Sequence, residues 1–356
     1  MLVSTESGIS LDELRLAARN HAMPLEALRW PITPAGLHYL LVHYDVPLVD
    51  PIAWQLEIGG AVDKPSTLRL DDLRSLPAVE LAVTMECAGN GRALLEPRPI
   101  SQPWLSEAVG TGLWRGAPLV ALLDATVPSE RAVEVVFTGL DRGVEGEVEQ
   151  RYERSLPLDA ARDAGCVLAY ELNGAPLPPQ HGFPLRLVVP GWYGMTNVKW
   201  LSAITVVEEP FSGYQVATGY RVRQNEDEEG RPVTHMRTRS LMVPPGIPDF
   251  LTRERIVDRG PVDIHGRAWS GRAPIVRVEV SVDGGTTWSD ARVERDPDHR
   301  WAWAGWSYRW EAAVEGRCTL CCRATDETGE TQPLEPEWNL GGYENNAFQR
   351  IPVIVR

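Results

Sequence analysis

The sequence has few cysteines, no long apolar run and no excess of basic residues. Only five cysteines occur among 356 residues, and an odd number without a secretory signal gives no disulfide framework. No stretch approaches the roughly 18 apolar residues that a membrane-spanning helix needs. The formal net charge of −14 lacks the basic footprint that nucleic acids and anionic membrane surfaces require. These features predict a cytoplasmic protein that binds neither nucleic acid nor membranes.

Two common phosphate-binding motifs are also missing. Neither GxGxxG nor GxxxxGK[ST] occurs, so the sequence supports neither a Rossmann dinucleotide site nor a P-loop. The C-x-x-C within residues 318–322 has no second cysteine pair and no nearby histidines at zinc spacing. Because it lies in a strand-like run, packing is the preferred interpretation of Cys318, Cys321 and Cys322.

One stretch of the N-terminal half combines a buried strand with a reactive residue. The apolar run 79–83 predicts a strand that delivers Cys87 to its end, and residues 88–91 (Ala-Gly-Asn-Gly) predict a tight turn. Arg92 follows, and a nearby guanidinium favours the thiolate form of a cysteine. A thiolate in such a turn suits a soft metal or a nucleophile. The alternative is that Cys87 is a small buried hydrophobic residue.

Two domains of different character are predicted. Residues 1–235 indicate a mixed α+β domain in which the apolar run 185–189 forms a central strand. Residues 236–356 combine alternating strands with turn signals such as Asp283-Gly284-Gly285, which is typical of an antiparallel β-sandwich of immunoglobulin type. The tryptophans of this domain favour core and interface positions over a ligand-stacking platform. Helices are expected near residues 10–30, 119–125 and 159–163, and strands near 53–58, 132–138, 166–171, 276–282, 300–310, 318–325 and 351–355.

Two stretches around the run 185–189 bring three cationic or titratable side chains together. A proline-rich loop that carries His181 leads into the run, Arg186 lies at the start of the run, and a glycine-rich segment after it leads to Lys199. Arg186 could bind a phosphate as a bidentate fork and Lys199 as a point charge. These residues therefore predict a phosphate-binding site.

Taken together, these stretches resemble the sulfite oxidase family of molybdenum enzymes, from about residue 38 to the end. The likeness rests on segments 87–90, 181–186, 197–201, 280–288 and 338–342. It implies an α+β protein in which a molybdopterin-binding domain over residues 1–235 precedes an immunoglobulin-like dimerisation domain over residues 236–356. It also implies a molybdenum atom held by a pyranopterin dithiolene, with Cys87 as the one protein ligand to the metal.

The resemblance also assigns roles to individual residues. Cys87, Tyr152 and Arg92 match catalytic positions: Tyr152 the active-site tyrosine and Arg92 an arginine that faces the substrate anion. An ordinary turn pair is the alternative for Tyr152 and Asp141. Residues that match cofactor-binding positions are His43, Tyr44, Cys87, Asn90, Asp141, His181, Arg186, Asn197, Val198 and Lys199.

The implied activity is two-electron oxygen-atom transfer on sulfite or a related small substrate. The resemblance also implies a homodimer. Because no haem domain is recognised, the electrons are expected to be exchanged with an external partner. The alternatives are an S-oxide or N-oxide reductase with the same cofactor, or a non-catalytic relative. The sequence departs from the family pattern where arginines are usual, at Val42, Gly91 and Ala304. Because charge-assisted hydrogen bonds contribute roughly 1.5–3 kcal/mol each, these losses predict weak sulfite binding.

Overall fold

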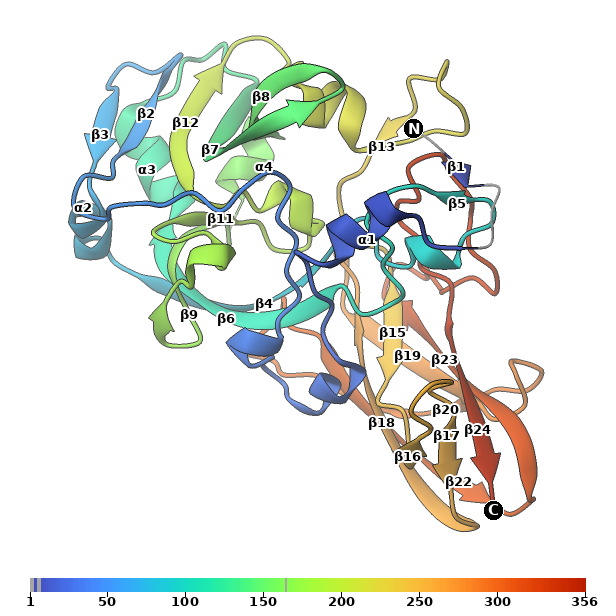
Figure 1. Cartoon of the computed structure of the whole chain (residues 1–356). Coiled ribbons are helices and arrows are strands. Elements are labelled where there is room, and N and C mark those ends of the chain that lie inside the picture. The colour runs from blue at the N-terminus through green and yellow to red at the C-terminus, as the bar shows by residue number, and fades with distance from the viewer. Residues whose placement is uncertain (1–2, 5–7, 164) are drawn as a thin grey trace.

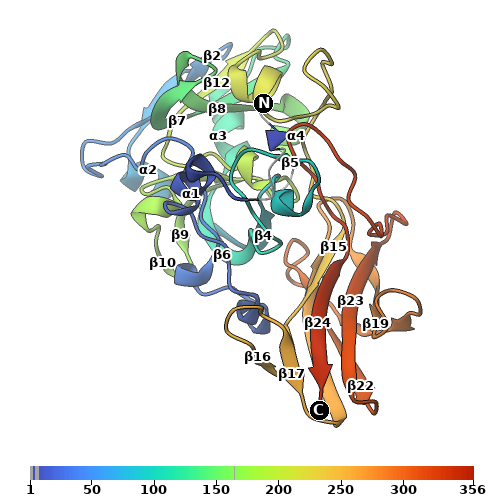
Figure 2. The same ribbon diagram turned by 45° about the vertical axis from the view of Figure 1, so that its right-hand side comes forward.

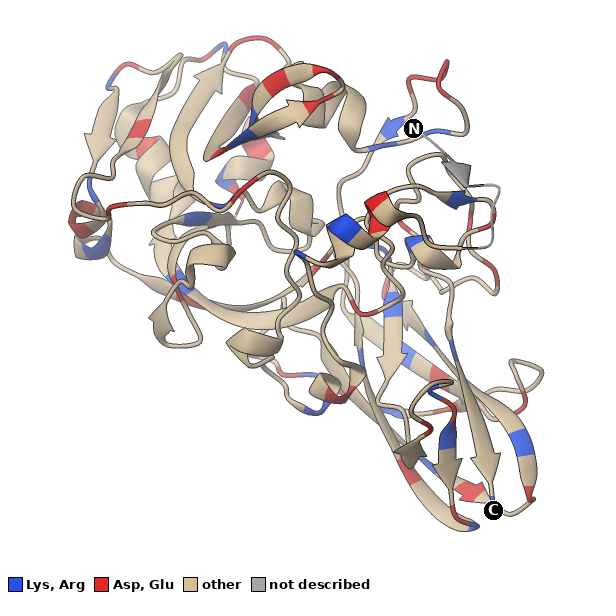
Figure 3. Ribbon diagram, viewed as in Figure 1, with Lys and Arg blue, Asp and Glu red and all other residues tan. Residues whose placement is uncertain are grey.

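The computed structural model describes residues 3–4, 8–163 and 165–356. Two bodies are visible in Figure 1: a rounded N-terminal domain and an elongated C-terminal domain that carries β24 and the C-terminus. The turned view in Figure 2 keeps the same two bodies. Charged residues are spread over both domains (Figure 3). Within the described ranges, no helix is long and apolar enough to cross a membrane.

The first sheet of the N-terminal domain carries the cysteine strand. Its order is β10-β9-β6-β4, and β11 also pairs with β9. The predicted strand before Cys87 is confirmed as β4, which pairs with β6 along its whole length and ends one residue before the cysteine. The strands are β4 (Val79–Glu86), β6 (Val109–Pro118), β9 (Val167–Leu172), β10 (Ala175–Pro176) and β11 (Arg186–Val188).

The second sheet packs against the first around one apolar core. Its order is β3-β2-β12-β7-β8, and the core includes Phe137 and Ile204 from this sheet and Leu168 and Leu187 from the other, each of them fully buried. The strands are β2 (Leu56–Gly60), β3 (Ser66–Leu68), β7 (Glu134–Glu145), β8 (Val148–Pro157) and β12 (Leu201–Val207). The helices are α2 (Leu70–Ser75), α3 (Leu119–Thr126) and α4 (Leu158–Arg162), so helices near 119–125 and 159–163 are confirmed.

Two local predictions for this domain are wrong. The helix expected over residues 10–30 is only α1 (Leu11–Ala17), capped by Ser10, followed by the short 3₁₀ turn η1 (Leu25–Arg29). Pro24 precedes η1 and cannot continue a helix, because it lacks a backbone N–H. The run 185–189 is buried but not central, since the three-residue β11 pairs only with β9 among the described strands. Its burial comes from packing in the core.

The N-terminal domain also contains several short elements. They are β1 (Val3–Ser4), η2 (Ala35–Leu37), η3 (Arg92–Leu94), β5 (Arg98–Pro99), η4 (Pro179–His181), η5 (Gly194–Thr196), η6 (Gln215–Gly219), β13 (Arg221–Val222) and β14 (Arg231–Pro232).

The C-terminal domain is a sandwich of two sheets. One sheet has the order β15-β18-β22-β21 and the other β16-β17-β24-β23-β19-β20. A single core joins them and includes Trp306, Trp310 and Cys322. The pairing is antiparallel except between β17 and β24, which run parallel. The strands are β15 (Arg239–Met242), β16 (Ile247–Pro248), β17 (Arg255–Val257), β18 (Gly260–Trp269), β19 (Ile275–Ser281), β20 (Ser289–Asp290), β21 (Arg292–Glu294), β22 (Ala304–Ala312), β23 (Gly316–Asp326) and β24 (Gln349–Val355).

The tryptophans and cysteines of this domain behave as packing residues. Trp306 and Trp310 lie in the sandwich core, whereas Trp269 and Trp303 pack in a cluster that also contains Ala88 and Tyr220 of the N-terminal domain. All five cysteines are free, and Cys318 and Cys322 face the sandwich core. The core and interface interpretation is therefore confirmed for these side chains.

Candidate functional site

The turn after β4 holds Cys87 at the boundary between the two domains. The Cys87 amide donates to the carbonyl of Ala108 over 2.9 Å, and the Cys87 carbonyl accepts from the Asn90 amide over 2.9 Å. Gly91 has a φ of +90°, and a Cβ there would lie 2.7 Å from Asn345 Nδ2. A Cβ at Gly89 would lie 2.4 Å from an Arg92 nitrogen. The small residues of the turn are therefore required by its tight surroundings.

Cys87 forms one wall of a small cavity of about 50 Å³. The cavity lies where η4, η5, β11 and the ends of β4 and β7 converge with the loops around His43 and Tyr220. The predicted site residues that line it are Cys87, His43, Asp141, Tyr152, His181, Arg186, Asn197 and Lys199. Segments that lie far apart in the sequence meet here: His43 and Tyr220, which are in contact, are 177 residues apart.

Two cations face the cavity against one carboxylate. Arg186 donates to the carbonyls of His181 and Asn197, each over 3.1 Å, and Lys199 donates to the carbonyl of Leu41. Burial lowers the pKa of Arg186 to about 10, and burial with the neighbouring Arg186 lowers the pKa of Lys199 to about 7. Burial raises the pKa of Asp141 to about 6. These directions follow from buried charges that lack enough counter-charge.

Three histidines around the cavity are neutral at pH 7. Burial, with help from nearby cations, lowers the pKa of His38 to about 4, of His43 to about 3 and of His181 to about 2. His38 and His181 meet edge to face with ring centroids 5.6 Å apart. Neutral imidazoles offer one donor and one acceptor each, which suits a polar heterocycle better than a simple anion.

The cavity contains polar atoms that no protein group satisfies. His38 Nε2, Asp141 Oδ1 and Arg186 Nε are buried and have no hydrogen-bond partner in the described part of the chain. A buried polar atom without a partner is costly, so such a cluster indicates a missing ligand. Unpaired donors and acceptors, an excess of positive charge and one thiol fit a pterin with an anionic phosphate and a soft metal. The residues present therefore suit the cofactor that the sequence resemblance implies.

Cys87 and Arg92 lie close together, but Arg92 does not line the cavity. Burial raises the pKa of the Cys87 thiol, whereas Arg92 lowers it. Arg92 Nε donates to the carbonyl of Gly341 over 2.9 Å and Nη1 to that of Gln102 over 3.1 Å. Its guanidinium carbon lies 5.3 Å from the centre of the Tyr343 ring. Arg92 is thus held behind the turn, and a substrate-facing role stays a prediction.

Three other predicted residues point away from the cavity. The Tyr44 hydroxyl donates to Glu145 over 3.2 Å, and Val198 packs in the N-terminal core. Asn90 donates to Glu86 over 2.9 Å and accepts from the Ala108 amide over 3.0 Å, so its side chain holds the turn itself. Their roles in binding the cofactor stay predictions.

Tyr220 lines the cavity and was missed from the sequence. Its hydroxyl contacts His43 Nε2, and its ring centre lies 5.2 Å from that of Tyr343. Arg154, a buried guanidinium, lies behind it at 5.5 Å from the ring centre. The predicted Tyr152 also lines the cavity, but its hydroxyl donates to the carbonyl of Met195 over 2.7 Å. No motif or periodicity marks Tyr220, which follows the short segment η6 in a polar loop.

Positions 42 and 304 offer no cation. Val42 is buried, and its amide donates to Asn20 Oδ1 over 2.7 Å. Ala304 packs within the sandwich core and not beside the cavity. A charged side chain at 304 would therefore enter the sandwich before it reached the site.

Comparison with known protein families identifies both halves of the chain. Residues 43–215 match the oxidoreductase molybdopterin binding domain, and residues 231–356 match the Mo-co oxidoreductase dimerisation domain. The second match begins close to the predicted domain boundary at residue 236.

Several known proteins are similar over most of this chain. Mitochondrial sulfite oxidase of Rattus norvegicus is 36% identical over 349 residues, which cover 91% of this chain and 62% of the relative. Sulfite oxidase of Gallus gallus is 34% identical over 90% of this chain and 72% of its own length. An NADH nitrate reductase of Brassica napus is 34% identical over 91% of this chain and 38% of its own length. The chain thus spans about 62% of the rat relative.

A solved structure shares the architecture. The sulfane dehydrogenase SoxCD from Paracoccus pantotrophus superimposes with a TM-score of 0.79 at 25% identity, covering 98% of this chain and 92% of that chain. The likeness extends over both domains, and therefore over the boundary at which Cys87 lies.

Proposed function

Because this chain belongs to the sulfite oxidase family of molybdopterin-dependent oxidoreductases, we propose that it transfers one oxygen atom between water and a small sulfur or nitrogen substrate, and two electrons between that substrate and an external partner. The observation that carries the proposal is the cavity between Cys87 and the cations Arg186 and Lys199, with its unpartnered polar atoms. The electrons are exchanged with an external partner.

The cavity residues divide into three groups by the part of the cofactor that they suit. The Cys87 thiolate is the soft ligand for the metal. Arg186 and Lys199 suit the phosphate, and Asp141, His38 and His181 suit the edge of the pterin, where neutral imidazoles and a carboxyl can donate or accept hydrogen bonds. When bound, the cofactor supplies a molybdenum atom that changes its oxidation state by two electrons.

Tyr220 and His43 form the polar end of the cavity. Burial raises the pKa of the Tyr220 phenol, so it keeps its proton at neutral pH and can hold it towards His43 or towards a substrate oxygen. Burial likewise raises the pKa of Tyr152, whose proton is committed to the carbonyl of Met195. Of the two phenols, Tyr220 is therefore the better donor to a substrate.

The substrate that this cavity favours carries little charge. Arg92 is occupied by two carbonyls and the Tyr343 ring, and Val42 provides no cation. An anion that enters such a site loses water without full compensation by paired donors. Sulfite is therefore expected to bind weakly, and a neutral sulfur compound better.

The reverse reaction, reduction of an S-oxide or N-oxide, is the second candidate. Two observations favour it: a nitrate reductase is among the similar proteins, and neutral oxides suit a site without a free substrate-facing cation. The cavity residues serve both directions, because a phenol that donates to the oxygen of an oxide also donates to the oxygen of a product.

The protein assembles as a homodimer through its C-terminal domain, which matches the family's dimerisation domain. A cytoplasmic location completes the proposal.

Metal analysis followed by dye-coupled turnover tests the proposal. Purified protein is expected to contain about one molybdenum per chain, and to turn over neutral sulfur compounds or their oxides with a lower KM than sulfite. Protein that contains no molybdenum after expression in a host that makes the cofactor would refute the proposal. A micromolar KM for sulfite would refute the substrate class alone.

A further inference from the structure

A buried ion pair between the two domains lies directly behind Cys87. Arg239 of β15 donates from Nη1 to Glu86 Oε1 over 2.8 Å, and Glu86 is the last residue of β4. Both side chains are almost completely buried, at 3% and 1% exposure. Trp269 of the C-terminal domain donates to the other oxygen of Glu86 over 2.9 Å. The carboxylate next to the cysteine is therefore satisfied mainly from the C-terminal domain.

The same domain holds the rest of the turn through a strap of residues 339–346. The Glu344 amide donates to the carbonyl of Ala88 over 2.9 Å, and Asn345 Nδ2 donates to that of Gly91 over 2.8 Å. The Asn345 carbonyl in turn accepts from Arg239 Nη1 over 2.7 Å. One guanidinium thus joins the last residue of β4 to the strap that covers the turn.

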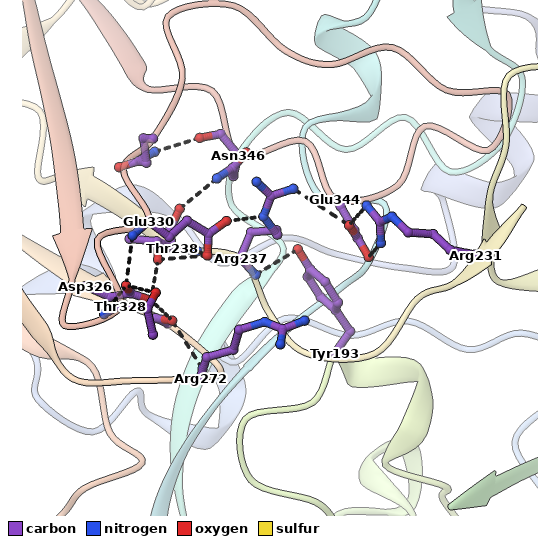
Figure 4. A network of polar contacts seen from close by, with 12 residues as sticks. Tyr193, Arg231, Arg237, Thr238, Arg272, Asp326, Thr328, Glu330, Glu344 and Asn346 are labelled. Atoms are coloured by element: carbon purple, nitrogen blue, oxygen red, sulfur yellow. Dashed lines mark hydrogen bonds and ion pairs between the residues drawn. The ribbon is translucent and has the colours of Figure 1, made fainter.

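Further contacts fix the strap in place (Figure 4). Glu344 accepts from both terminal nitrogens of Arg231, over 2.9 and 2.6 Å, and Asn346 donates to the carbonyl of Thr238 over 3.1 Å. Thr238 immediately precedes Arg239 and donates to Asp326 over 2.9 Å. The strap and Arg239 therefore belong to one connected polar network in the C-terminal domain.

Removal of the guanidinium would affect the turn more than an ordinary surface change. Glu86 would keep its bonds from Trp269 and Asn90 but lose its counter-ion in a buried setting, where an unpaired charge is strongly unfavourable. Glu86 is joined directly to Cys87, so a shift of its carboxylate towards water must move the backbone that carries the thiol.

We propose that Arg239 is a positioning residue for Cys87, and that the C-terminal domain thereby completes the cofactor site as well as serving dimerisation. Arg239 does not line the Cys87 cavity, so it acts through Glu86 and the strap. The proposal depends on the proposed function only in treating Cys87 as the reactive sulfur. The placement of the Cys87 thiol can be measured in cofactor-free protein, without an assay of enzyme activity.

The test compares Arg239→Met and Arg239→Lys with Arg255→Met in the full-length chain. Arg255 is a similarly buried arginine of the same domain. It bonds to the carbonyls of Pro244 and Pro245 and pairs with Glu26 of the N-terminal domain over 3.6 Å, so none of these contacts involves the turn. The first readout is the rate of iodoacetamide labelling of Cys87 in cofactor-free protein, followed by mass spectrometry of its peptide. The second readout is molybdenum per chain in protein expressed with cofactor supply.

Arg239→Met is expected to label Cys87 at least fivefold faster than wild type and to retain less than half of the molybdenum. Arg239→Lys keeps the positive charge but loses the guanidinium group, so its labelling rate and molybdenum content should lie between those of Arg239→Met and wild type. Arg255→Met should match wild type in both. Labelling and molybdenum within twofold of wild type in Arg239→Met would overturn the proposal, as would equal effects of Arg255→Met.

A milder variant covers the case in which Arg239→Met does not fold. Trp269→Phe removes one donor to Glu86 and keeps the ion pair. It should accelerate Cys87 labelling two- to fivefold, and an unchanged rate would count against the proposal. Because labelling needs no cofactor, a protein without molybdenum would refute the proposed function while the labelling rates still decide the role of Arg239.

Discussion

Lys199 should destabilise the cofactor-free protein and stabilise the loaded one. Its ammonium group has one carbonyl partner, Leu41, and the partly compensating charge of Asp141, and burial lowers its pKa to about 7. The unfolded chain retains the ordinary value of 10.5. Between these two values the unfolded state binds more protons, so the free energy of unfolding rises with pH. Substitution by methionine removes this penalty.

The magnitude follows from the same two values. Charging Lys199 in the folded state costs ~4–5 kcal/mol at pH 6 and ~2 kcal/mol at pH 9. The lost bond to the Leu41 carbonyl offsets about 1–3 kcal/mol of the gain. Lys199→Met should therefore be more stable than wild type by ~2–3 kcal/mol at pH 6, and the difference should fall to near zero by pH 9. Asp141 reduces this gain, because its buried carboxylate loses the favourable charge of Lys199 in the variant. The loss is greater at pH 9, where the carboxylate is ionised, so it also makes the difference fall as the pH rises.

Urea unfolding of cofactor-free protein at pH 6 and pH 9 measures this difference. Lys64→Met is the matched control, because Lys64 is the chain's other lysine and is exposed. In the loaded protein the sign reverses: loss of a charge-assisted bond of about 1.5–3 kcal/mol should weaken cofactor retention roughly ten- to hundredfold. A Lys199→Met protein that is less stable than wild type at pH 6, or a difference that grows with pH, would refute the reasoning.

Three further outcomes are expected. Tyr220→Phe should lower kcat at least tenfold, and similar kcat values for the variant and wild type would exclude Tyr220 as the proton donor. Tyr152→Phe should instead lower the free energy of unfolding by about 1–3 kcal/mol, because the buried carbonyl of Met195 loses its donor. A large loss of kcat with an unchanged free energy of unfolding would identify Tyr152 as the catalytic phenol. Light scattering at micromolar concentration should give twice the chain mass of 39.5 kDa, and a monomer would contradict dimerisation.

Local sequence signals predicted the turn and the cations well. A buried run followed by small residues fixed the end of β4 and the place of Cys87, because both depend on neighbouring residues alone. The prolines and glycines around residues 178–194 likewise marked the loops that carry His181 and Lys199. Strand periodicity predicted the two-sheet C-terminal domain, whose alternating faces share one core.

What the sequence could not predict depends on contacts between distant segments. Tyr220 reaches the cavity because η6 turns its loop towards His43, and nothing near Tyr220 in the sequence records that contact. The resemblance assigns Asn90 to the cofactor, and that role stays a prediction; the positions of Glu86 and Ala108, which bond to its side chain within the turn, could not be predicted from neighbouring residues. The pairing of Glu86 with Arg239 spans 153 residues, so local periodicity and motif spacing could not predict it.

The central claim is that Cys87 supplies the protein sulfur of a molybdenum site. X-ray absorption at the molybdenum edge, on wild type and Cys87→Ser purified in parallel, tests it most directly. Serine is harder to deprotonate and a poorer ligand for a soft metal, so the variant should lose one sulfur from the metal's coordination shell and nearly all activity. Arg186 and Lys199 should still retain part of the cofactor. An unchanged sulfur count with full activity in Cys87→Ser would contradict the account.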